Sequence, residues 1–304
     1  MSTFLLFLTC ILIWGSTWLA ITFQLGEISP FYSVGLRFGI AALLLGLYCK
    51  YKRLDMRLPM AVHWRLVVTG VCLYTLDYVF LYHSQQYLIS AWVALLSSSI
   101  VYLNVLFRRV LFKRTVRVEV LSGGLLGATG LVILFWEPLT SVDLGQYFML
   151  GLVLATVSFV FASLGNVFSE SALDKGAPVV QVNFYAMLYS LPVTFGIALV
   201  TGASFVLPNN PDYWLSLLYL SVFGSVLAFG AYMKLVQRLG ADKSAYVVLM
   251  YPLVALFLST LFEAYEWHLR DAVGVLLILL GNYVAMGLYQ SVIICDRSAR
   301  SQGH

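Results

Sequence analysis

Long apolar stretches alternate with short polar segments along the whole chain. The hydrocarbon core of a bilayer is about 30 Å thick and needs about 20 mostly apolar residues per helix. Ten stretches fit this template, namely 4–23, 31–49, 66–84, 88–107, 118–136, 147–168, 181–201, 214–233, 244–262 and 272–293. They are continuously apolar, whereas the strands of a membrane β-barrel alternate apolar and polar residues. The pattern therefore predicts an all-α integral membrane protein with ten transmembrane helices.

The second half of the chain repeats the first at an offset of 151 residues (274 − 123). The pairs that match without a gap are Ala94 with Ala245, Gly123 with Gly274, and Gly130 with Gly281. A repeat of this length indicates a duplicated domain, with one unit over 1–143 and another over 144–304. Each unit holds five helices, and because five is odd the second unit must enter the membrane upside down. Such inverted repeats are a recurrent plan of secondary transporters, since two similar halves can exchange conformations around one central site.

Composition and charge agree with a membrane protein. Hydrophobic residues make up 61% and charged residues 11% of the 304 residues, which is more apolar surface than a soluble chain of this length can bury. The net charge of +4 comes from cations gathered in a few loops, and this argues against nucleic acid as a partner. If ten helices alternate, these loops share one side. By the positive-inside rule that side is cytoplasmic, and both termini are expected there.

Motifs of catalysis and cofactor binding are missing from the sequence. It contains no Walker loop, HExxH or GxSxG segment, so neither an ATP-driven pump nor a known hydrolase is indicated. The four cysteines are Cys10, Cys49, Cys72 and Cys295, and they lack metal-ligand spacing. Cysteines in or beside apolar stretches are typically small buried hydrophobic residues. We expect no enzyme activity, no cofactor and no metal.

Two charged residues, Arg37 and Asp77, lie well inside predicted helices. Counted at 1.5 Å per residue, they sit roughly 9 and 10 Å below the outer surface, so their depths match. Charges within a membrane usually pair, and they mark transport pathways or proton relays. Two interpretations follow. The residues form a structural pair that fixes helices 2 and 3, or Asp77 faces a cavity and binds a proton or the amine of a solute.

Aromatic and polar residues on the same helices are candidates for a solute site. Helical spacing places Tyr74, Asp77 and Tyr78 on one face, which suits a zwitterionic or aromatic solute. Amide and hydroxyl side chains are costly against lipid, so they are expected to face protein or a cavity. The full set of predicted binding residues is Trp14, Trp18, Tyr74, Asp77, Tyr78, Trp92, Ser98, Asn166, Tyr246 and Tyr251.

Several short motifs occur in an order that resembles one known family. They are Trp14-Gly15-Ser16, Gly35-Leu36-Arg37-Phe38, the segment 85–91, and Pro252 with Gly274 and Gly281. Together they resemble the drug/metabolite transporter superfamily, specifically its EamA-type members with ten helices. The resemblance implies export or exchange of small metabolites across the bacterial inner membrane, through a cavity lined mainly by helices 1, 3, 4, 6, 8 and 9. Family members often have a proline in helix 4 that matches Pro252, and here that position is Val101.

The leading hypothesis is a secondary carrier that exports or exchanges a small organic metabolite by alternating access. An amino acid or aromatic compound is favoured, because few intramembrane acids are present to attract cationic drugs. The alternatives are a multidrug or toxic-compound exporter and a non-transporting membrane scaffold. The expected partners are a small-molecule solute and the lipid bilayer, with protons as a candidate coupling ion. The sequence leaves the oligomeric state open.

Overall fold

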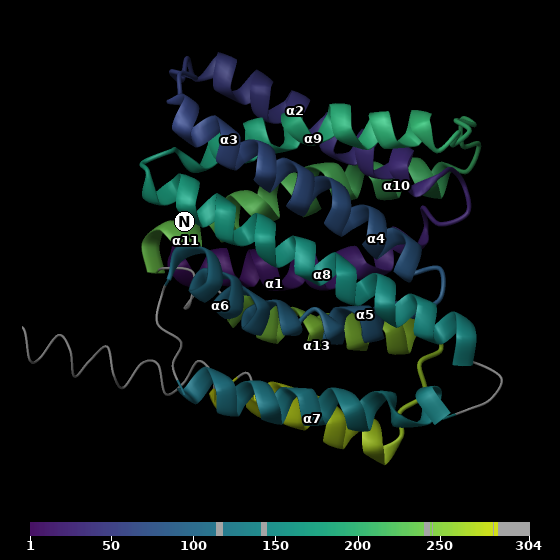
Figure 1. Cartoon of the computed structure of the whole chain (residues 1–304). Helices are drawn as coiled ribbons and strands as arrows, with labels where there is room; N and C mark the ends of the chain where they lie inside the picture. Colours follow the sequence, from purple (N-terminus) through teal and green to yellow (C-terminus); the bar gives the residue numbers. More distant parts are fainter. Residues whose placement is uncertain (114–117, 141–144, 240–243, 245, 282, 285–304) are drawn as a thin grey trace, which may run out of the picture.

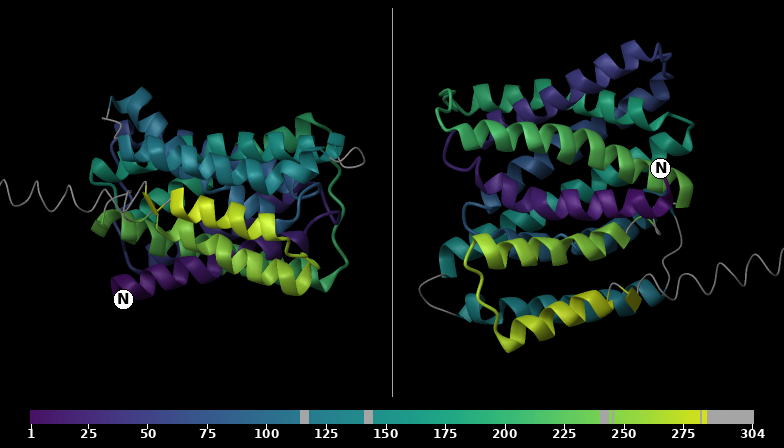
Figure 2. Two further views of the ribbon diagram at one scale, coloured as in Figure 1. Left: turned by 90° about the horizontal axis from the view of Figure 1, so that it is seen from below. Right: turned by 180° about the vertical axis from the view of Figure 1, so that it is seen from behind.

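The computed structural model describes residues 1–113, 118–140, 145–239, 244, 246–281 and 283–284. Within them every regular element is a helix, and the helices run side by side along a common direction (Figures 1 and 2). They are α1 (Thr3–Thr22), α2 (Pro30–Tyr51), α3 (Met60–Thr69), η1 (Gly70–Leu76), α4 (Asp77–Ser84), α5 (Ser90–Leu96), α6 (Ser99–Phe112), α7 (Val118–Thr140), α8 (Gly145–Asp174), α9 (Val179–Val200), α10 (Pro211–Tyr219), η2 (Leu220–Leu227), α11 (Ala228–Leu239) and α13 (Tyr246–Phe262). A last helical stretch covers residues 269–281.

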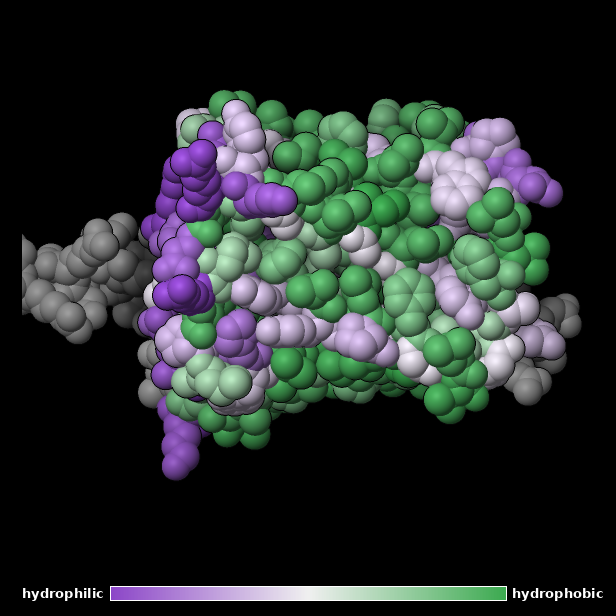
Figure 3. All heavy atoms as spheres, turned by 90° about the horizontal axis from the view of Figure 1, so that it is seen from above, coloured by the Kyte–Doolittle hydropathy of each residue, from purple (hydrophilic) through white to green (hydrophobic). Residues whose placement is uncertain are grey.

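Seven helical segments of the described chain are long and apolar enough to cross a membrane. They are Thr3–Thr22, Pro30–Tyr51, Met60–Ser84, Ser90–Phe112, Tyr147–Asp174, Val179–Val200 and Pro211–Leu235. Two shorter apolar helices, Ser122–Leu134 and Met250–Phe262, fall on two further predicted spans. The predicted span 272–293 overlaps the helix at 269–281 and continues outside the described residues. The prediction of an all-α, multi-pass membrane protein is confirmed, and Figure 3 shows the apolar belt between more hydrophilic ends.

One end of the bundle carries a strongly basic connection. α2 ends there and α3 begins there, and the connecting segment brings Lys50, Lys52, Arg53 and Arg57 together. The N-terminus lies at the same end (Figure 1). We call this end the basic end and the other one the opposite end.

Turn and cap residues account for several helix boundaries. Pro30 and Pro211 occupy the first turns of α2 and α10, where a missing backbone N–H breaks no helical hydrogen bond. The side chain of Asn210 accepts a hydrogen bond from the Asp212 backbone N–H at 3.0 Å and so caps α10. Gly26, in the turn after α1, has a φ of 83°, which glycine adopts without steric strain.

Helices from the two halves of the sequence interleave. α2 packs against α9, α1 against α13, and α8 against both α4 and α6 (Figure 1). α7 pairs with the helix at 269–281 through glycines. A Cβ on Gly130 would lie 2.6 Å from the Gly274 carbonyl oxygen, and one on Gly281 would lie 2.5 Å from that of Gly123. Glycine lets membrane helices approach closely. Here the glycines of the two halves meet crosswise, because Gly130 meets Gly274 and Gly123 meets Gly281.

Two of the helices contain a π-helical segment at matching places. The Asp77 backbone N–H donates to the Cys72 carbonyl at the end of η1, and that of Ala228 donates to Phe223 at the end of η2. Both hydrogen bonds reach five residues back along the chain. Asp77 and Ala228 are separated by 151 positions (228 − 77), which is the offset of the sequence repeat. π-helical turns are rare in proteins overall, and those that occur often lie at functional sites.

The fourth predicted helix is broken even though it lacks the proline of its counterpart. A turn at Ser97 and Ser98 separates α5 from α6, whereas α13 continues through Pro252. Ser97 Oγ donates a hydrogen bond to the Ala94 carbonyl at 2.5 Å, and serine side chains that bond nearby backbone groups compete with helical structure. A pair of serines therefore interrupts this helix a few residues before Val101, the position that matches Pro252.

Candidate functional site

Six helical segments surround a cavity of about 90 Å³ inside the bundle. A single buried water needs about 10–15 Å³ by the same measure, so the cavity has room for a small organic solute. The lining residues come from α1, the continuous η1–α4 segment, α6, α8, α11 and α13, and they are Trp14, Thr17, Trp18, Ile21, Leu73, Asp77, Tyr78, Leu81, Ile100, Phe159, Ala162, Asn166, Phe229, Tyr232, Val248 and Tyr251. These segments correspond to predicted helices 1, 3, 4, 6, 8 and 9.

Aromatic rings form much of the cavity wall. The centroid of the Trp14 ring lies 5.1 Å from that of Phe229 and 5.0 Å from that of Tyr232. The Trp18 and Tyr251 rings lie 5.8 Å apart. Aromatic pairs at such distances stabilise one another, and their faces attract cationic groups. The wall is therefore suited to an apolar or aromatic solute that carries a positive charge.

The polar atoms of these rings differ in their bonding. Trp14 Nε1 donates to the Gly224 carbonyl oxygen at 3.2 Å, and the hydroxyl oxygens of Tyr251 and Ser97 lie 2.5 Å apart. Trp18 Nε1 has no hydrogen-bond partner among the described residues. A buried donor without a partner costs about 1–3 kcal/mol. A bound solute that offers an acceptor to Trp18 would remove that cost.

Asp77 brings a carboxylate to the aromatic cavity. It is 7% exposed, and its Oδ1 accepts a hydrogen bond from Ser158 Oγ on α8 at 2.5 Å. Of the described residues that line the cavity, Asp77 alone carries a formal charge. A buried charge is costly without a counter-charge and further hydrogen bonds. The arrangement therefore favours binding of an ammonium group or a proton at this carboxylate.

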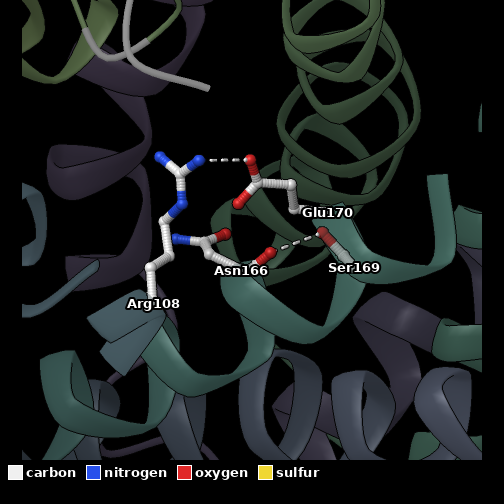
Figure 4. A network of polar contacts seen from close by, with 4 residues as sticks. All are labelled: Arg108, Asn166, Ser169 and Glu170. Carbon is white, nitrogen blue, oxygen red and sulfur yellow. Dashed lines mark hydrogen bonds and ion pairs between the residues drawn. The ribbon is translucent and has the colours of Figure 1, made fainter. Parts of the chain in front are cut away.

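A polar network joins α6 to α8 at the basic end of the cavity. Arg108 Nη2 on α6 lies 3.2 Å from Glu170 Oε1 on α8, and Figure 4 marks this ion pair with a dashed line. On the same helix, Ser169 Oγ donates to the backbone carbonyl of Asn166 at 3.1 Å. Asn166 lines the cavity, so the ion pair lies about one helical turn beyond the cavity floor. The network connects the first half of the sequence to the second.

Helix α5 is tied to α13 at the opposite end. The carboxylate of Glu263, just after α13, accepts hydrogen bonds from the hydroxyls of Ser90 and Ser259, and from the Ser90 backbone N–H at 3.3 Å. Closer to the cavity, Gln85 Nε2 donates to the Trp18 carbonyl at 3.0 Å. The contacts of Glu263 again connect the first half of the sequence to the second. Both ends of the cavity thus carry polar links between the halves.

Two segments of the chain, residues 1–136 and 149–287, match the sequence model of the EamA-like transporter family. The chain belongs to this family. The resemblance seen in its motifs is thereby confirmed, and the two matched segments leave uncovered only residues 137–148 and 288–304.

Relatives of this EamA-like chain have a similar length. An uncharacterized transporter of Archaeoglobus fulgidus is 24% identical over 279 residues, which cover 90% of this chain and 94% of the relative. Protein PagO of Salmonella typhimurium is 22% identical, with 93% and 92% covered, and the uncharacterized transporter YoaV of Bacillus subtilis is 23% identical, with 90% and 92% covered. A protein of known crystal structure shares the fold with a TM-score of 0.70 at 22% identity, covering 95% of this chain and 98% of its own.

The structure brings six of the predicted binding residues together in the cavity of this EamA-like protein. They are Trp14, Trp18, Asp77, Tyr78, Asn166 and Tyr251. Their role in solute binding stays a prediction.

Other predicted binding residues lie away from the cavity lining. Tyr74 is 1% exposed and its hydroxyl donates to Asn183 Oδ1 at 3.3 Å, and the Trp92 ring packs edge-on against Phe148 at 5.3 Å. Ser98 is buried beside the break in helix 4, where its neighbour Ser97 is the one that bonds a lining residue. The side chain of Tyr246, at the start of α13, lies outside the described part of the chain.

Arg37 lies behind the cavity wall. It is 1% exposed, its Nε donates to Ser225 Oγ at 3.1 Å, and its Cζ lies 4.5 Å from the centroid of the Tyr78 ring. Among the described residues Arg37 and Asp77 form no ion pair within 4.0 Å, because Arg37 bonds η2 while Asp77 bonds α8. Arg37 and Asp77 were predicted to lie at the same depth in the membrane, but their side chains are not in direct contact.

Phe229 and Tyr232 of α11 line the cavity but were not among the predicted residues. The sequence repeat contains the signal that finds them. Adding its offset to Tyr78 gives Phe229 (78 + 151), and adding it to Leu81 gives Tyr232 (81 + 151). Similar halves place similar positions on a shared cavity, so lining residues of one half identify those of the other.

Proposed function

We propose that this protein is a secondary carrier that exports or exchanges a small organic metabolite with an amino group and an apolar or aromatic body, such as an amino acid. The observation that carries the proposal is Asp77, the one charged residue among the described lining residues, set within aromatic walls. A carboxylate binds ammonium groups through charge-assisted hydrogen bonds, and aromatic faces attract cations and apolar groups alike. Membership of a transporter family supports movement of the bound solute across the membrane.

Transport proceeds by alternating access in this proposal, with the two halves acting as inverted repeats. Arg108 and Glu170 close the basic end, while Ser90 and Glu263 close the opposite end. Opening one link while keeping the other exposes the cavity to one side at a time. The basic end faces the cytoplasm, as the positive-inside rule predicts, and the bacterial inner membrane is the proposed location.

The π-helical segments are the proposed flexing points of this cycle. η1 leads directly into Asp77 and Tyr78, and η2 leads into Phe229. Conversion of a π-helical turn into α-helix shifts the register by one residue, which rotates the following side chains by about 100°. Such a rotation would turn these lining residues toward or away from the solute. A proton on Asp77 is a candidate partner in the cycle, because the carboxylate must be neutralised when no ammonium group is bound.

A counterflow assay in liposomes tests the proposed solute class. Three probes share one aromatic ring and differ in charge: phenylalanine, phenethylamine, which lacks the carboxylate, and 3-phenylpropionate, which lacks the amine. We expect saturable exchange of one or both amines and none of 3-phenylpropionate. Exchange of 3-phenylpropionate alone would contradict the role given to Asp77. Absence of exchange for a wide solute panel, with protein shown to be folded, would favour the non-transporting scaffold.

A multidrug exporter is the second candidate. The same aromatic wall, with rings from α1, α8, α11 and α13 around one carboxylate, also suits lipophilic cations. The breadth of the solute range separates the two candidates. Exchange of several unrelated bulky cations with similar affinity would support a multidrug exporter, whereas exchange confined to small amines would support the metabolite carrier.

A further inference from the structure

A groove of about 310 Å³ lies between the end of α2 and the start of α9 at the basic end. Its lining includes Gly46, Lys50, Arg53, Leu54, Phe184 and Tyr185. Figure 3 views the side of the molecule that α2 and α9 form and shows hydrophilic side chains gathered at one end of the apolar belt. The groove is separate from the central cavity, with which it shares no lining residue.

The two cations of the groove have no anionic partner in the part of the chain that the structure describes. Lys50 and Arg53 are exposed, and neither forms an ion pair within the described residues. The acid of the neighbouring loop, Asp55, accepts a hydrogen bond from the Arg57 backbone N–H at 3.0 Å. A pair of unneutralised cations beside an apolar surface creates a local site for an anion.

The backbone fixes both cations at the same groove. Arg53 has a φ of 50°, a left-handed conformation that favours glycine at helix ends. The Arg53 N–H donates to the Lys50 carbonyl at 3.1 Å, and the Leu54 N–H donates to the Cys49 carbonyl at 3.0 Å. These bonds close the end of α2 and hold the chain tightly there. A charged residue thus occupies a strained position where glycine would fit without strain.

Apolar and aromatic surface forms the rest of the groove. The Tyr185 hydroxyl donates to the Met56 carbonyl at 2.7 Å and so joins α9 to the loop. A Cβ on Gly46 would lie 3.0 Å from the Phe184 ring, so the glycine lets this ring pack directly against α2 and form the apolar floor. Further along the same side, Leu47 of α2 is 56% exposed. Acyl chains would find a continuous apolar surface running from the groove into the membrane belt.

We propose that this groove binds an anionic phospholipid, with the headgroup phosphate between Lys50 and Arg53 and the acyl chains along α2 and α9. Arginine and lysine at the polar boundary of a membrane attract anionic lipids, and basic pockets between transmembrane helices hold their headgroups. Arginine adds directional hydrogen bonds to phosphate. The site would tie the loop between α2 and α3 to the membrane surface.

Native mass spectrometry of the purified protein in detergent tests the proposal with two lipids of equal chain length, phosphatidylglycerol and phosphatidylcholine. We expect a specific phosphatidylglycerol adduct and a much weaker phosphatidylcholine adduct. A cation that contacts an anionic headgroup contributes about fivefold to the binding of the lipid, so Lys50→Gln with Arg53→Gly should weaken phosphatidylglycerol binding about 25-fold. Arg53→Gly removes the strained residue, so the lipid-free variant should unfold at the same or a higher temperature than the parent protein.

Lys52→Gln is the matched control, because Lys52 belongs to the same turn but does not line the groove. Its binding of phosphatidylglycerol should stay within about twofold of the parent protein. Equal adducts with both lipids, or unchanged binding by the double variant, would overturn the proposal. An equal loss in Lys52→Gln would also overturn it, because the attraction would then come from the general charge of the basic end.

Discussion

The close contact between α7 and the helix at 269–281 predicts that Gly130→Ala destabilises the protein. A Cβ at this position would lie 2.6 Å from the Gly274 carbonyl oxygen and 2.8 Å from the Ile278 backbone nitrogen. Both atoms belong to the backbone, so no side-chain rotation can relieve the clash and the helices must move apart. Overpacking of this kind costs about 1–3 kcal/mol. The expected loss of unfolding free energy is therefore about 1–3 kcal/mol.

Reversible unfolding in mixed micelles of mild detergent and dodecyl sulfate measures this change. Gly124→Ala on the same helix is the matched control, because its Cβ would approach the Tyr102 ring no closer than 3.4 Å, an ordinary van der Waals contact. We expect that control to stay within about 0.5 kcal/mol of the parent protein or to gain stability from helix propensity. Equal stability of Gly130→Ala and Gly124→Ala would refute the close contact between these helices.

Three further predictions concern the cavity and its closures. Ser158→Ala removes the hydrogen bond to Asp77 and should lower the unfolding free energy by about 1–3 kcal/mol. A double-mutant cycle checks this, because the same substitution should cost less when Asp77 is already Asn. Trp18→Phe removes the unpartnered N–H, which is stabilising, and part of a buried apolar ring, which is destabilising. The two effects oppose each other, so the unfolding free energy should stay nearly unchanged while the KM for the solute rises by about three- to tenfold. Arg108→Glu should slow exchange by breaking the link to Glu170, and the swap Arg108→Glu with Glu170→Arg should restore part of the rate; full activity of Arg108→Glu would argue against a closure at that end.

Much of the fold could be predicted from the sequence, because membrane helices must satisfy their backbone hydrogen bonds internally and therefore appear as long apolar runs. The glycine pairs were visible for a related reason, since close helix contacts require small residues. The π-helical segments could not be predicted from the sequence. Nothing in the residue types of the run Gly70–Leu76 differs from ordinary apolar helix, so the hydrogen bond from the Asp77 N–H to the Cys72 carbonyl could not be predicted from them.

The candidate site could be predicted in part. Trp14 and Asp77 stood out because a mid-span tryptophan and a mid-span acid are rare, and both line the cavity. In a regular α-helix Tyr74 would lie on nearly the same face as Asp77. The π-helical turn between them changes the angular spacing, and the Tyr74 hydroxyl instead donates to Asn183 of α9. The prediction that these side chains share one face assumed an α-helical period, and it does not hold where the backbone departs from that period.

The measurement that tests the account most directly compares counterflow by the parent protein with counterflow by Asp77→Asn, using whichever amine the probe screen identifies. Hydrogen bonds to a charged group contribute about 1.5–3 kcal/mol, so removing the charge should raise the KM for that amine by at least about tenfold. Asp212→Asn, an exposed acid at the start of α10, serves as the control and should exchange the amine like the parent protein. Asp77→Asn protein that is folded and exchanges the amine with unchanged KM would contradict the central claim that Asp77 recognises the solute.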